Sequence, residues 1–487
     1  MTVTPAPLRD LVAGRWRDAE VELALVRENP LTGEALGPAL ATSAARVEEA
    51  LAAADAVQDA WAATSPEARA TALEAVAAAL APRVAEIAAL ESFATGVPIR
   101  QTLPLGMIIT GSFLLAAGQL REGWLTRKLQ REDGRETEVL LLPWGPALCL
   151  TPWNAPAPMG AHKVANALAA GCPAILKASE YVPYGSQLMA EVIDAALREA
   201  GVPDGVFQFV QGDASVGGKL TLDARVRAVS FTGGAKGGAA VAAACGAGVK
   251  PVQLELGGNN PLVILPGTDI EVAARAAVDL LTTLNGQWCR ALGRLIVPAD
   301  DHDAIVSAVL DRLATLKPGD PLDESTDYGP LVHSAHRALV QAQRAALGGT
   351  VHTALKVAEE GNFLSPSLVT GVPPEQAVEE IFGPVATVHA YGTVEEALAL
   401  ANGTAYGLEA YVFGPDEDAA LAVARRVRAG EVKVNGSSIM SLHLFAPRPA
   451  WGRSGLGEEG TAETLRFFTN PRVVGTEGGF ALHSREA

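Results

Sequence analysis

Apolar and polar residues alternate with two different patterns, one helical and one strand-like, along this chain of 487 residues. Residues 43 to 95 carry long patterns of Ala, Leu and Glu, such as RVEEALAAADAVQDAW, with a break at SPEARA. This spacing of apolar positions predicts amphipathic helices. In residues 131 to 150 a charged DGR turn joins two runs of strand-like residues, which predicts a hairpin that leads into a buried strand.

From residue 147 to residue 265, strand and helix patterns alternate regularly. The predicted strands are ALCLT, AILKAS, VFQFVQ, VRAVSFTGG and LVILP, separated by helical segments such as SQLMAEVIDAALREAG. Repeated strand–helix–strand order is typical of a doubly wound, Rossmann-like α/β sheet, which binds nucleotides at the ends of its strands. A second alternating block, from about 270 to 435, predicts a second α/β unit. A last predicted strand, LRFFTNPRVVGT, has no evident partner nearby.

Composition and charge then narrow the class of protein. The chain is 49% apolar and 19% charged, with 49 Gly and 31 Pro, which is typical of a globular protein rich in turns, and its length favours two or three domains. A formal net charge of −17 argues against a nucleic-acid partner, which would need a basic face. The N-terminus lacks a signal-peptide pattern, and no apolar stretch approaches the roughly 20 residues that span a bilayer. We therefore expect a cytoplasmic protein with no membrane partner.

Four cysteines, Cys149, Cys172, Cys245 and Cys289, are scattered without a CxxC pair or a nearby histidine. This pattern fits neither a disulfide framework nor a zinc site, so we expect no metal. Cys289 stands in NGQWCRALGR. An isolated cysteine in a chain of this size is more often a core residue than a nucleophile, and the decapeptide alone leaves both interpretations open.

Two short segments place hydrogen-bonding side chains directly after predicted strands. PWNAP, residues 152 to 156, carries Asn154, whose amide can donate hydrogen bonds from a loop. LELGGNNP, residues 254 to 261, ends a strand with Glu255 and continues with two glycines that allow close approach of backbone or ligand. A carboxylate at such a place is costly unless it has a partner or a use.

Three further segments suit a nucleotide, although each also fits a plain structural role. FTGG followed by AKGGAAVAAACG is a strand, a Gly-rich turn and a helix, whose free N–H groups can bind a pyrophosphate, but it is not the GxGxxG fingerprint. ILKASE ends a strand with Lys177 and Glu180, which can bind ribose hydroxyls or form a surface ion pair. EEIFGPV places Glu380 near Phe382 in a Gly-Pro turn that equally fits a packed loop.

Taken in order, these segments resemble the aldehyde dehydrogenase superfamily. NPLTGE, PWNAP, LKASE, GVPDGVFQFVQG, FTGG, LELGGNNP, GQWCRALGR, EEIFGPV, AYGLEAYVF and VNG occur in the family's order and with family-like spacing through nearly the whole chain. The resemblance implies an NAD-dependent oxidation of an aldehyde to its carboxylic acid. Glu255 favours the hydrolytic branch over the CoA-acylating branch, in which this glutamate is absent.

The resemblance also implies a role for each matching residue. Cys289 is the expected nucleophile, Glu255 the general base, Asn154 half of the oxyanion hole, and Lys163 a residue near the proton pathway. A thiolate attacks the aldehyde, hydride leaves for the nicotinamide, and activated water hydrolyses the resulting thioester. The implied cofactor is NAD, with NADP as the alternative, and the implied cofactor residues are Thr151, Pro152, Trp153, Lys177, Ser179, Glu180, Phe231, Thr232, Gly233, Gly234, Leu256, Gly257, Glu380 and Phe382.

The chain departs from the family pattern in four segments. KASE has Ala178 where proline is common, and FTGG has Gly234 where serine is common. PRPAWGRSG, residues 447 to 455, replaces a glycine-rich loop and puts Arg448 at an aromatic position of the substrate tunnel. Ala155 replaces a bulky aromatic residue, and His162 stands at a second position that is often aromatic. The expected substrate-binding residues are Ala155, Met159, His162, Trp288, Arg290 and Arg448.

These departures suggest that the substrate is a polar or anionic aldehyde, bound by Arg290 or Arg448 through charge-assisted hydrogen bonds. The alternative is that Arg290 turns away into an ion pair and that Arg448 faces solvent. The remaining histidines receive no predicted role: His302, His333, His336, His352, His389, His443 and His483.

The resemblance further divides the chain. Residues 1–123 and 143–255 are expected to form the NAD-binding domain, residues 256–455 the catalytic domain, and residues 124–142 and 456–487 a small β oligomerisation element of a homodimer or homotetramer. Two other functions stay open from the residues alone. One is a thiol esterase or acyl transferase that works without redox chemistry, and the other is a catalytically silent binding protein on the same fold.

Overall fold

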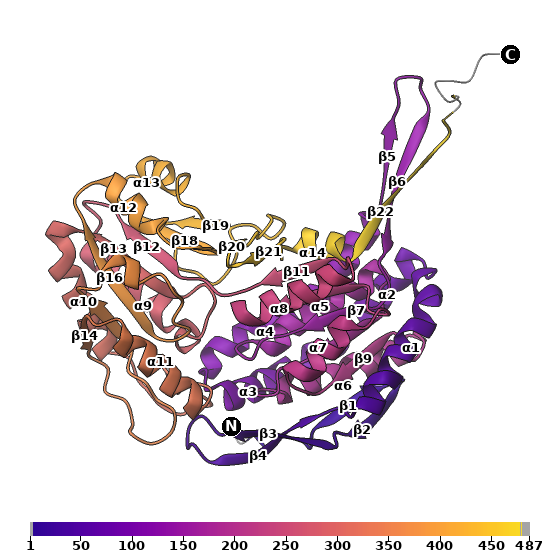
Figure 1. The fold of residues 1–487 in the computed structure, drawn as a ribbon, viewed down its shortest axis with the longest axis horizontal. Coiled ribbons are helices and arrows are strands. Elements are labelled where there is room, and N and C mark those ends of the chain that lie inside the picture. Colours follow the sequence, from indigo (N-terminus) through magenta and orange to yellow (C-terminus); the bar gives the residue numbers. More distant parts are fainter. Residues whose placement is uncertain (1–2, 478, 480–487) are drawn as a thin grey trace.

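The computed structural model describes residues 3 to 477 and residue 479, and Figure 1 shows two α/β halves with a narrow ribbon of strands rising from one of them. The N-terminal segment lies at the base of the molecule, far from that ribbon. The predicted fold class, α/β with a doubly wound Rossmann-like unit, a second α/β unit and a small β element, is confirmed.

The first half is built on an eight-stranded sheet in the order β2-β1-β9-β8-β7-β10-β11-β21. Its central strands run parallel. The chain makes β8 and β9 on one side of β7 and then returns to place β10 on the other, so the strand order reverses between β7 and β10. Such a reversal opens a crevice at the carboxyl ends of the strands. The strands are β1 (Arg9–Val12), β2 (Arg15–Asp18), β7 (Ala147–Leu150), β8 (Ala174–Lys177), β9 (Phe207–Val210), β10 (Ala228–Thr232), β11 (Val252–Glu255) and β21 (Gly455–Leu456).

Helices cover both faces of this sheet, which is why its central strands are apolar almost throughout. In β7, Ala147 and Cys149 pack into one layer, whereas Leu148 and Leu150 pack into the other. The first layer comes mainly from α2 (Pro66–Leu80), α3 (Val84–Thr95), α4 (Ile99–Arg121), α5 (Pro156–Ala170) and α6 (Tyr184–Glu199). The second layer comes from α1 (Ala44–Ala62), α7 (Ala214–Leu222) and α8 (Ala235–Ala247).

The second half is built on a seven-stranded sheet in the order β14-β15-β16-β13-β12-β18-β19, parallel except for β14. Its strands are β12 (Asn260–Ile264), β13 (Leu292–Pro298), β14 (Thr350–Thr353), β15 (Ser367–Thr370), β16 (Val385–Tyr391), β18 (Glu409–Phe413) and β19 (Glu431–Val434). Helices α9 (Ile270–Thr282) and α10 (His302–Ala314) pack on one face, and α12 (Val394–Ala401) and α13 (Glu417–Ala424) on the other; α11 (Ser334–Ala346) packs near β15.

One predicted strand belongs to the other sheet. LVILP, expected in the first alternating block, is part of β12 and pairs with β13 and β18 of the second sheet. The chain crosses between the sheets at Gly257 and Gly258, directly after β11. Alternation along the sequence predicts strands correctly but does not say which sheet each one joins.

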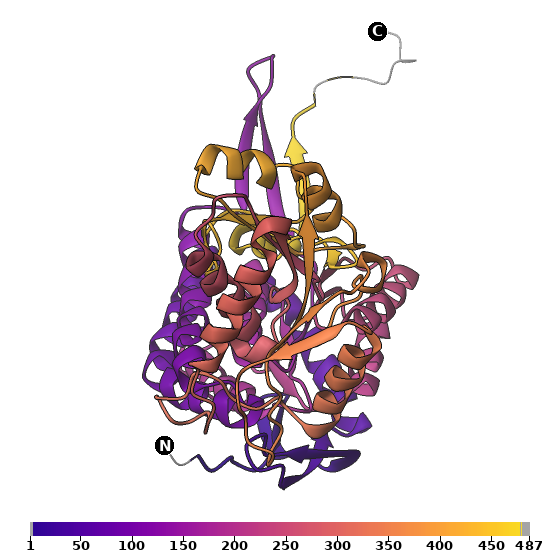
Figure 2. The same cartoon turned by 90° about the vertical axis from the view of Figure 1, so that its left-hand side faces the viewer.

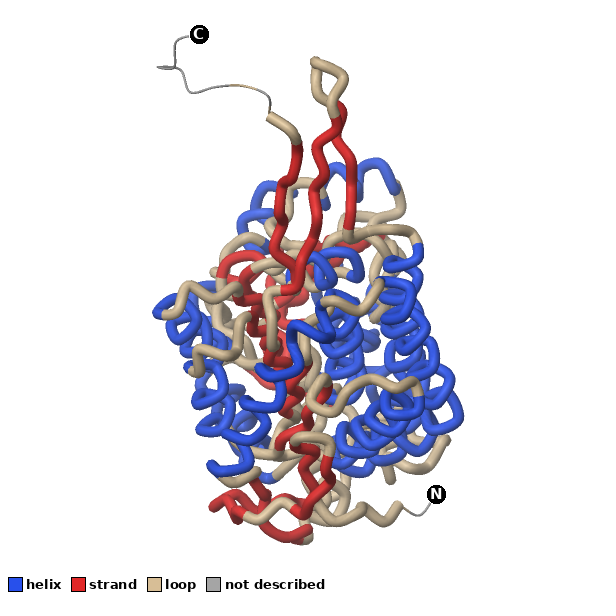
Figure 3. Tube along the Cα trace, turned by 90° about the vertical axis from the view of Figure 1, so that its right-hand side faces the viewer, coloured by secondary structure: helices blue, strands red, loops and turns tan. Residues whose placement is uncertain are grey.

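The protruding ribbon is a three-stranded antiparallel sheet in the order β22-β6-β5, which Figures 2 and 3 show standing clear of both halves. It consists of β5 (Thr126–Gln130), β6 (Glu136–Pro143) and β22 (Thr469–Gly475). The hairpin prediction is confirmed. The tail strand finds its partner in β6, but its expected first residues, LRFF, fall mostly in helix α14 (Thr461–Phe467), whose Leu465 packs into the core of the first half.

Several elements were not predicted. They include two antiparallel pairs, β3 (Val21–Glu28) with β4 (Ala35–Ala41) and the two-residue strands β17 (Tyr406–Gly407) with β20 (Trp451–Gly452). Helix α4 also corrects an expectation about membrane spans. Within the described residues it is the one helix long and apolar enough to cross a membrane by length and composition, and half of its apolar window is buried inside the protein.

Candidate active site

The candidate site lies between the two halves, at the carboxyl ends of β7 and β11. Asn154 follows β7, Glu255 is the last residue of β11, and Cys289 stands just before β13. Residues far apart in the sequence and on different sheets therefore meet in one place.

The turn before Cys289 is held in an uncommon backbone conformation by one buried amide. Asn285 has a φ of 57°, in the left-handed region. Its side chain donates to the carbonyls of Gly96 at 2.8 Å and Pro330 at 3.0 Å, and accepts from the N–H of Gly329 at 3.0 Å. Tertiary contacts thus set the direction in which the chain presents Cys289.

Cys289 and Glu255 are in direct contact, with Sγ 3.5 Å from Oε1. Burial, and then the negative charge of Glu255, raise the pKa of the Cys289 thiol well above its ordinary value. The thiol is therefore protonated here and donates to the carboxylate. The Asn154 amide donates to the Gln287 carbonyl at 2.9 Å, which brings the predicted oxyanion donor beside the turn that carries the thiol.

Lys163 lies on α5 and is completely buried. It donates to Ser230 Oγ at 2.8 Å and forms a direct ion pair with Glu459. Burial lowers the pKa of Lys163 to about 8, so its proton can leave near neutral pH. Glu459 also accepts from the hydroxyl of Thr232, a predicted cofactor residue. Sequence reasoning missed Glu459 because its GEEG segment fell in the part assigned to oligomerisation.

A cavity of about 240 Å³ gathers most of the predicted cofactor residues around Cys289. Glu380 accepts from the N–H of Gly258 at 2.8 Å, and burial raises its pKa to about 7. Trp153 and Phe382 contact each other edge to face, with ring centroids 5.3 Å apart. The predicted residues in the cavity wall are Pro152, Trp153, Asn154, Thr232, Gly233, Gly234, Leu256, Gly257, Glu380 and Phe382, together with Cys289.

Other predicted cofactor residues lie behind or beyond this wall. Lys177 is buried at the end of β8, where its ammonium donates to the carbonyls of Ala178 at 2.9 Å and Gly212 at 2.5 Å and lies 3.7 Å from Glu180. Burial lowers the pKa of Lys177. The buried side chains of Thr151 and Ser179 lie on the same edge of the sheet, and Phe231 underlies the turn at Gly233.

His336, to which the sequence assigned no role, lies in the wall of the cofactor cavity. Its Nε2 donates to the Phe382 carbonyl at 2.7 Å, and its ring meets Trp153 edge to face at 5.0 Å. Burial lowers the pKa of His336 to about 4, so the ring is neutral. The sequence around His336 does not predict this position, because its contacts with Trp153 and Phe382 form only when distant segments pack together.

A second cavity, of about 360 Å³, has Glu255 in its wall, whereas Cys289 lines the first. The predicted residues Met159, His162 and Arg448 line it. His162 hydrogen-bonds Thr464 Oγ1 at 3.0 Å, and burial lowers its pKa to about 3. Most of the remaining wall is apolar and comes from α4 and the segment before β20, including Met107, Ile108, Leu115, Ile439, Met440 and Leu444.

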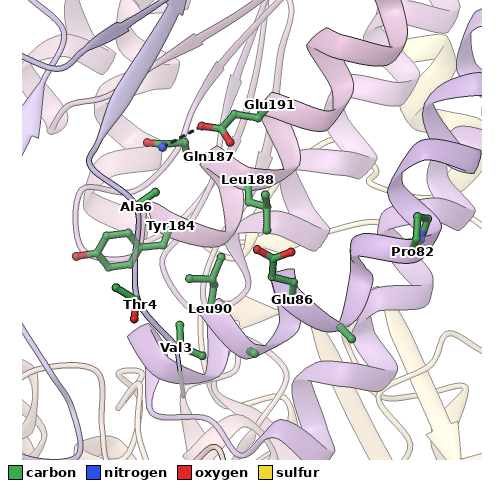
Figure 4. Close-up of a pocket in the computed structure, with 12 residues that line it drawn as sticks. Val3, Thr4, Ala6, Pro82, Glu86, Leu90, Tyr184, Gln187, Leu188 and Glu191 are labelled. Atoms are coloured by element: carbon green, nitrogen blue, oxygen red, sulfur yellow. Dashed lines mark hydrogen bonds between the residues drawn. The ribbon is translucent and has the colours of Figure 1, made fainter. Parts of the chain in front are cut away.

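A larger hollow, of about 470 Å³, lies beneath the N-terminal segment and against α3 and α6 (Figure 4). Its polar groups include Glu86 and Gln187, and the Gln187 amide donates to Glu191 at 3.2 Å. The predicted site residues are not among its lining residues. Among the described side chains, no group of three or more His, Cys, Asp or Glu could hold a metal ion.

The model of the aldehyde dehydrogenase family matches residues 16–474. The chain belongs to the aldehyde dehydrogenase family. It is 35% identical to 3-succinoylsemialdehyde-pyridine dehydrogenase of a Pseudomonas species, over 96% of this chain and 98% of that protein, and 33% identical to betaine aldehyde dehydrogenase 2 of Rhizobium meliloti, over 92% of each. Aldehyde dehydrogenase C of Pseudomonas syringae, solved as a mutant with NAD+ and octanal, is 31% identical with a TM-score of 0.90, over 97% of this chain and 98% of that one.

Members of the aldehyde dehydrogenase family are NAD(P)-dependent, and the residues present fit such a cofactor. A Cβ atom at Gly257 would lie 1.9 Å from Glu380 Oε2, and one at Gly233 would lie 2.7 Å from the Phe231 ring. A side chain at either position would displace Glu380 or Phe231, and the two glycines leave bare backbone facing the cavity. Gly234 begins α8 without a side-chain cap, so the first N–H groups of that helix are free for a pyrophosphate.

In this aldehyde dehydrogenase, three predicted substrate contacts are not in the wall of the second cavity. Trp288 is 6% exposed and packs into the apolar core of the second half. Arg290 is 3% exposed, and its guanidinium pairs with Glu409 and lies 3.6 Å from Glu255. Buried carboxylates on β18 and β19 need a counter-charge, and they draw Arg290 away from the cavity. Ala155 lies just before α5 and outside the walls of both cavities.

Proposed function

We propose that this chain oxidises an aldehyde to its carboxylic acid with NAD as cofactor, through a thioester on Cys289 that is hydrolysed by water activated at Glu255. The observation that carries the proposal is the 3.5 Å contact between Cys289 Sγ and Glu255 Oε1 at the junction of two cavities. The cavity lined by Cys289 can hold a nicotinamide cofactor and the cavity lined by Glu255 an aldehyde, so we place the two reactants on either side of this contact.

The chemistry begins with a proton transfer. Because the pKa of the buried Cys289 thiol is raised, the thiol needs a base, and Glu255 is in position to accept its proton. The thiolate then attacks the aldehyde carbon. The resulting oxyanion is stabilised by N–H donors, one from the Asn154 side chain and one from the backbone of Cys289. To do so, the Asn154 amide gives up its hydrogen bond to the Gln287 carbonyl and donates to the substrate oxygen instead.

NAD, when bound, supplies the hydride acceptor. The chain's part is to hold that acceptor beside Cys289. We assign the adenosine ribose to Lys177 and Glu180, the pyrophosphate to the turn at Gly233 and Gly234, and the nicotinamide side to Glu380. Relatives solved with NAD+, including a point mutant of betaine aldehyde dehydrogenase from Staphylococcus aureus, support NAD as the cofactor.

Glu255 acts a second time in thioester hydrolysis. Its carboxylate takes a proton from water, the water oxygen attacks the acyl carbon, and the carbon–sulfur bond breaks to return Cys289 and release the acid. We propose that Lys163 and Glu459 carry away the protons that Glu255 takes first from the thiol and then from water. Glu459 lines the same cavity as Glu255 and contacts Thr232, the register partner of Glu255, and the Lys163 ammonium has a pKa of about 8.

For the substrate, we propose an aldehyde with an apolar chain and an anionic far end that reaches Arg448. Arg448 lines the substrate cavity, its Nε lies 3.6 Å from Glu431, and that Nε has no hydrogen-bond partner. Relatives named for succinate semialdehyde and glutarate semialdehyde favour such a substrate. Adipate semialdehyde and hexanal, which have equal chain lengths, test it: a clear preference for hexanal contradicts the proposal, and Arg448→Ala should remove the preference for the anion.

We further propose that residues 1–123 and 143–255 form the NAD-binding domain, residues 256–455 the catalytic domain, and residues 124–142 and 456–487 the oligomerisation element of a homodimer or homotetramer. Part of that last segment, residues 478 and 480–487, lies outside the described residues. Exposed apolar side chains on the ribbon, Leu129 at 46% and Val473 at 68%, support a covered surface there. Four free cysteines favour a reducing compartment, for which we propose the cytoplasm.

One measurement separates this function from its alternatives. Purified protein is mixed with adipate semialdehyde in the presence and absence of NAD, and acid and NADH are measured together. The proposal predicts equal amounts of acid and NADH, and neither without NAD. Acid release from p-nitrophenyl acetate, with no acid and no NADH from the aldehyde, would indicate the redox-independent thiol esterase or acyl transferase, and binding without turnover of either compound would indicate a silent binding protein.

A further inference from the structure

We propose that Arg290 is a positioning residue that anchors the Glu255 carboxylate against the Cys289 thiol and supplies its counter-charge. The inference rests on the proposed role of Glu255 as the base. It gives a use to an arginine that lies next to the nucleophile in the sequence but does not line the substrate cavity.

One oxygen of Glu255 is shared between two partners. Oε1 lies 3.5 Å from Cys289 Sγ and 3.6 Å from Arg290 Nη2. The side chain of Arg290 is 4% exposed, so it has no room to turn toward solvent. The thiol and the guanidinium therefore fix the same carboxylate oxygen from two directions, and the carboxylate cannot swing away from Cys289 without losing its cation.

Arg290 is itself held from the second sheet. Its Nη1 pairs directly with Glu409 of β18 and lies 3.9 Å from Glu431 of β19. The hydroxyl of Tyr411 donates to the Arg290 carbonyl at 2.9 Å. A guanidinium is a planar fork and can bridge two carboxylates in this way, whereas a lysine ammonium is a single point of charge.

The charges around Arg290 balance. Three cations, Arg290, Lys433 and Arg448, face three carboxylates, Glu255, Glu409 and Glu431. Lys433 pairs with Glu409, whereas Glu255 has its ion pair with Arg290. Loss of a cation from a buried cluster leaves an uncompensated charge. Loss of Arg290 places part of that charge on Glu255, and loss of Lys433 places it on Glu409.

The electrostatics of Glu255 agree with this geometry. Burial alone pulls its pKa upward, but Arg290, followed by Arg448 and Lys163, outweighs burial and holds the pKa below its ordinary value. The other titratable groups that face Glu255 are the Cys289 thiol and His162, whose pKa is lowered to about 3 so that it is neutral. Arg290 also opposes the rise in the pKa of the Cys289 thiol. Without Arg290, both groups hold their protons to higher pH.

The test uses p-nitrophenyl acetate, which acylates a reactive thiol without NAD or a known aldehyde. Release of p-nitrophenolate in a burst reports acylation of Cys289, and the following steady rate reports hydrolysis of the thioester. The rate of this second phase is measured across acidic pH for wild type, Arg290→Met, Arg290→Lys and the matched control Lys433→Met.

In the pH–rate profile of thioester hydrolysis, the rate falls off at acidic pH. We expect Arg290→Met to move this acidic limb to higher pH by about 1 unit or more, the effect of losing an opposite charge at this distance. Arg290→Lys should give a smaller shift, because one ammonium reaches one carboxylate. Lys433→Met should leave the limb in place, although it removes a cation from the same cluster.

Two results would overturn the proposal: an unmoved limb in Arg290→Met, or an equal shift in Lys433→Met. If Arg290→Met does not fold, the double variant Arg290→Met, Glu409→Gln, which removes one charge of each sign, takes its place with the same expected shift. Glu255→Gln is measured in parallel. Normal hydrolysis by Glu255→Gln defeats the proposed base and this inference together, whereas a stalled Glu255→Gln with an unmoved Arg290→Met limb defeats the inference alone.

Discussion

The thiol of Cys289 and the carboxylate of Glu255 face each other at 3.5 Å, although one residue precedes a strand of the second sheet and the other ends a strand of the first. The distance between the proposed nucleophile and its base is therefore set by how the two halves pack, not by local sequence. Residues that tie the halves together should affect turnover as well as stability.

Asn285 is such a residue. Its buried amide makes three backbone hydrogen bonds, of which the one to Gly96 crosses to the first half, while its own backbone is left-handed. Asn285→Ala should lower the free energy of unfolding by roughly 3 kcal/mol, because several buried partners lose their bonds, and should lower kcat. Asn285→Gly is the matched control. Glycine adopts the left-handed backbone without strain, but like alanine it cannot make the three hydrogen bonds. It should recover part of the stability, as measured by denaturant unfolding, and little of the activity.

Asn154 tests the oxyanion site. Asn154→Ala should lower kcat by about 100-fold to 1000-fold, the usual cost of one lost oxyanion donor, with a small effect on the melting temperature because the side chain is only partly buried. Asn154→Asp keeps the shape of the side chain but loses the donor, so it should be as slow. An active Asn154→Asp would show that the donor is not needed.

Glu180 tests cofactor choice. Its carboxylate lies beside Lys177 at the edge proposed to bind the adenosine ribose, where negative charge disfavours a 2′-phosphate. Glu180→Gln should raise kcat/KM for NADP relative to NAD. Glu199→Gln, at the exposed end of α6, serves as the control and should leave the ratio unchanged. A ratio that does not move in Glu180→Gln would argue against this ribose site.

Glu91 predicts a pH dependence of stability. The carboxyl group is buried on α3, accepts from the N–H of Ala157 at 3.4 Å, and leaves its second oxygen without a partner. Burial raises its pKa from 4.5 to about 8. Because the folded pKa is raised, the folded state binds more protons than the unfolded state between these values, and stability is lost as pH rises through this window.

Glu91→Gln should remove that loss. The difference in unfolding free energy between variant and wild type should shift in favour of the variant as pH rises from about 4.5 to about 8, by up to about 1.4 kcal/mol per unit. Glu86→Gln, on the same helix but exposed to solvent, should show no such trend. Parallel stability curves for wild type and Glu91→Gln would contradict the raised pKa.

The sequence predicted the two sheets well because parallel strands buried on both faces have continuous apolar runs, as in β7 to β10. The sequence-based prediction was wrong where tertiary contacts determine which sheet a strand joins or whether a segment is helical. LVILP has the same pattern as its neighbours but joins the other sheet after the glycine crossing, and LRFF is helical because Leu465 packs into the first core. Strands of two residues, such as β17 and β20, are too short to show any alternation.

The candidate site shows the same division. Motif order predicted that PWN, LELGG and GQWC carry the chemistry, and the structure brings their polar residues together. His336 and Glu459 gave no signal, since their neighbours come from distant segments. The prediction for Arg290 was wrong. An arginine beside the nucleophile suggests a substrate contact, but the carboxylate that pairs with it, Glu409, lies more than a hundred residues away in the sequence.

The most direct measurement follows NADH in the first turnovers, with NAD and whichever of adipate semialdehyde and hexanal reacts faster. The account predicts a burst and a steady phase for wild type, a single equivalent of NADH followed by a stall at the thioester for Glu255→Gln, and no NADH for Cys289→Ala. Equal steady-state rates for wild type and Glu255→Gln, or NADH formation by Cys289→Ala, would contradict it.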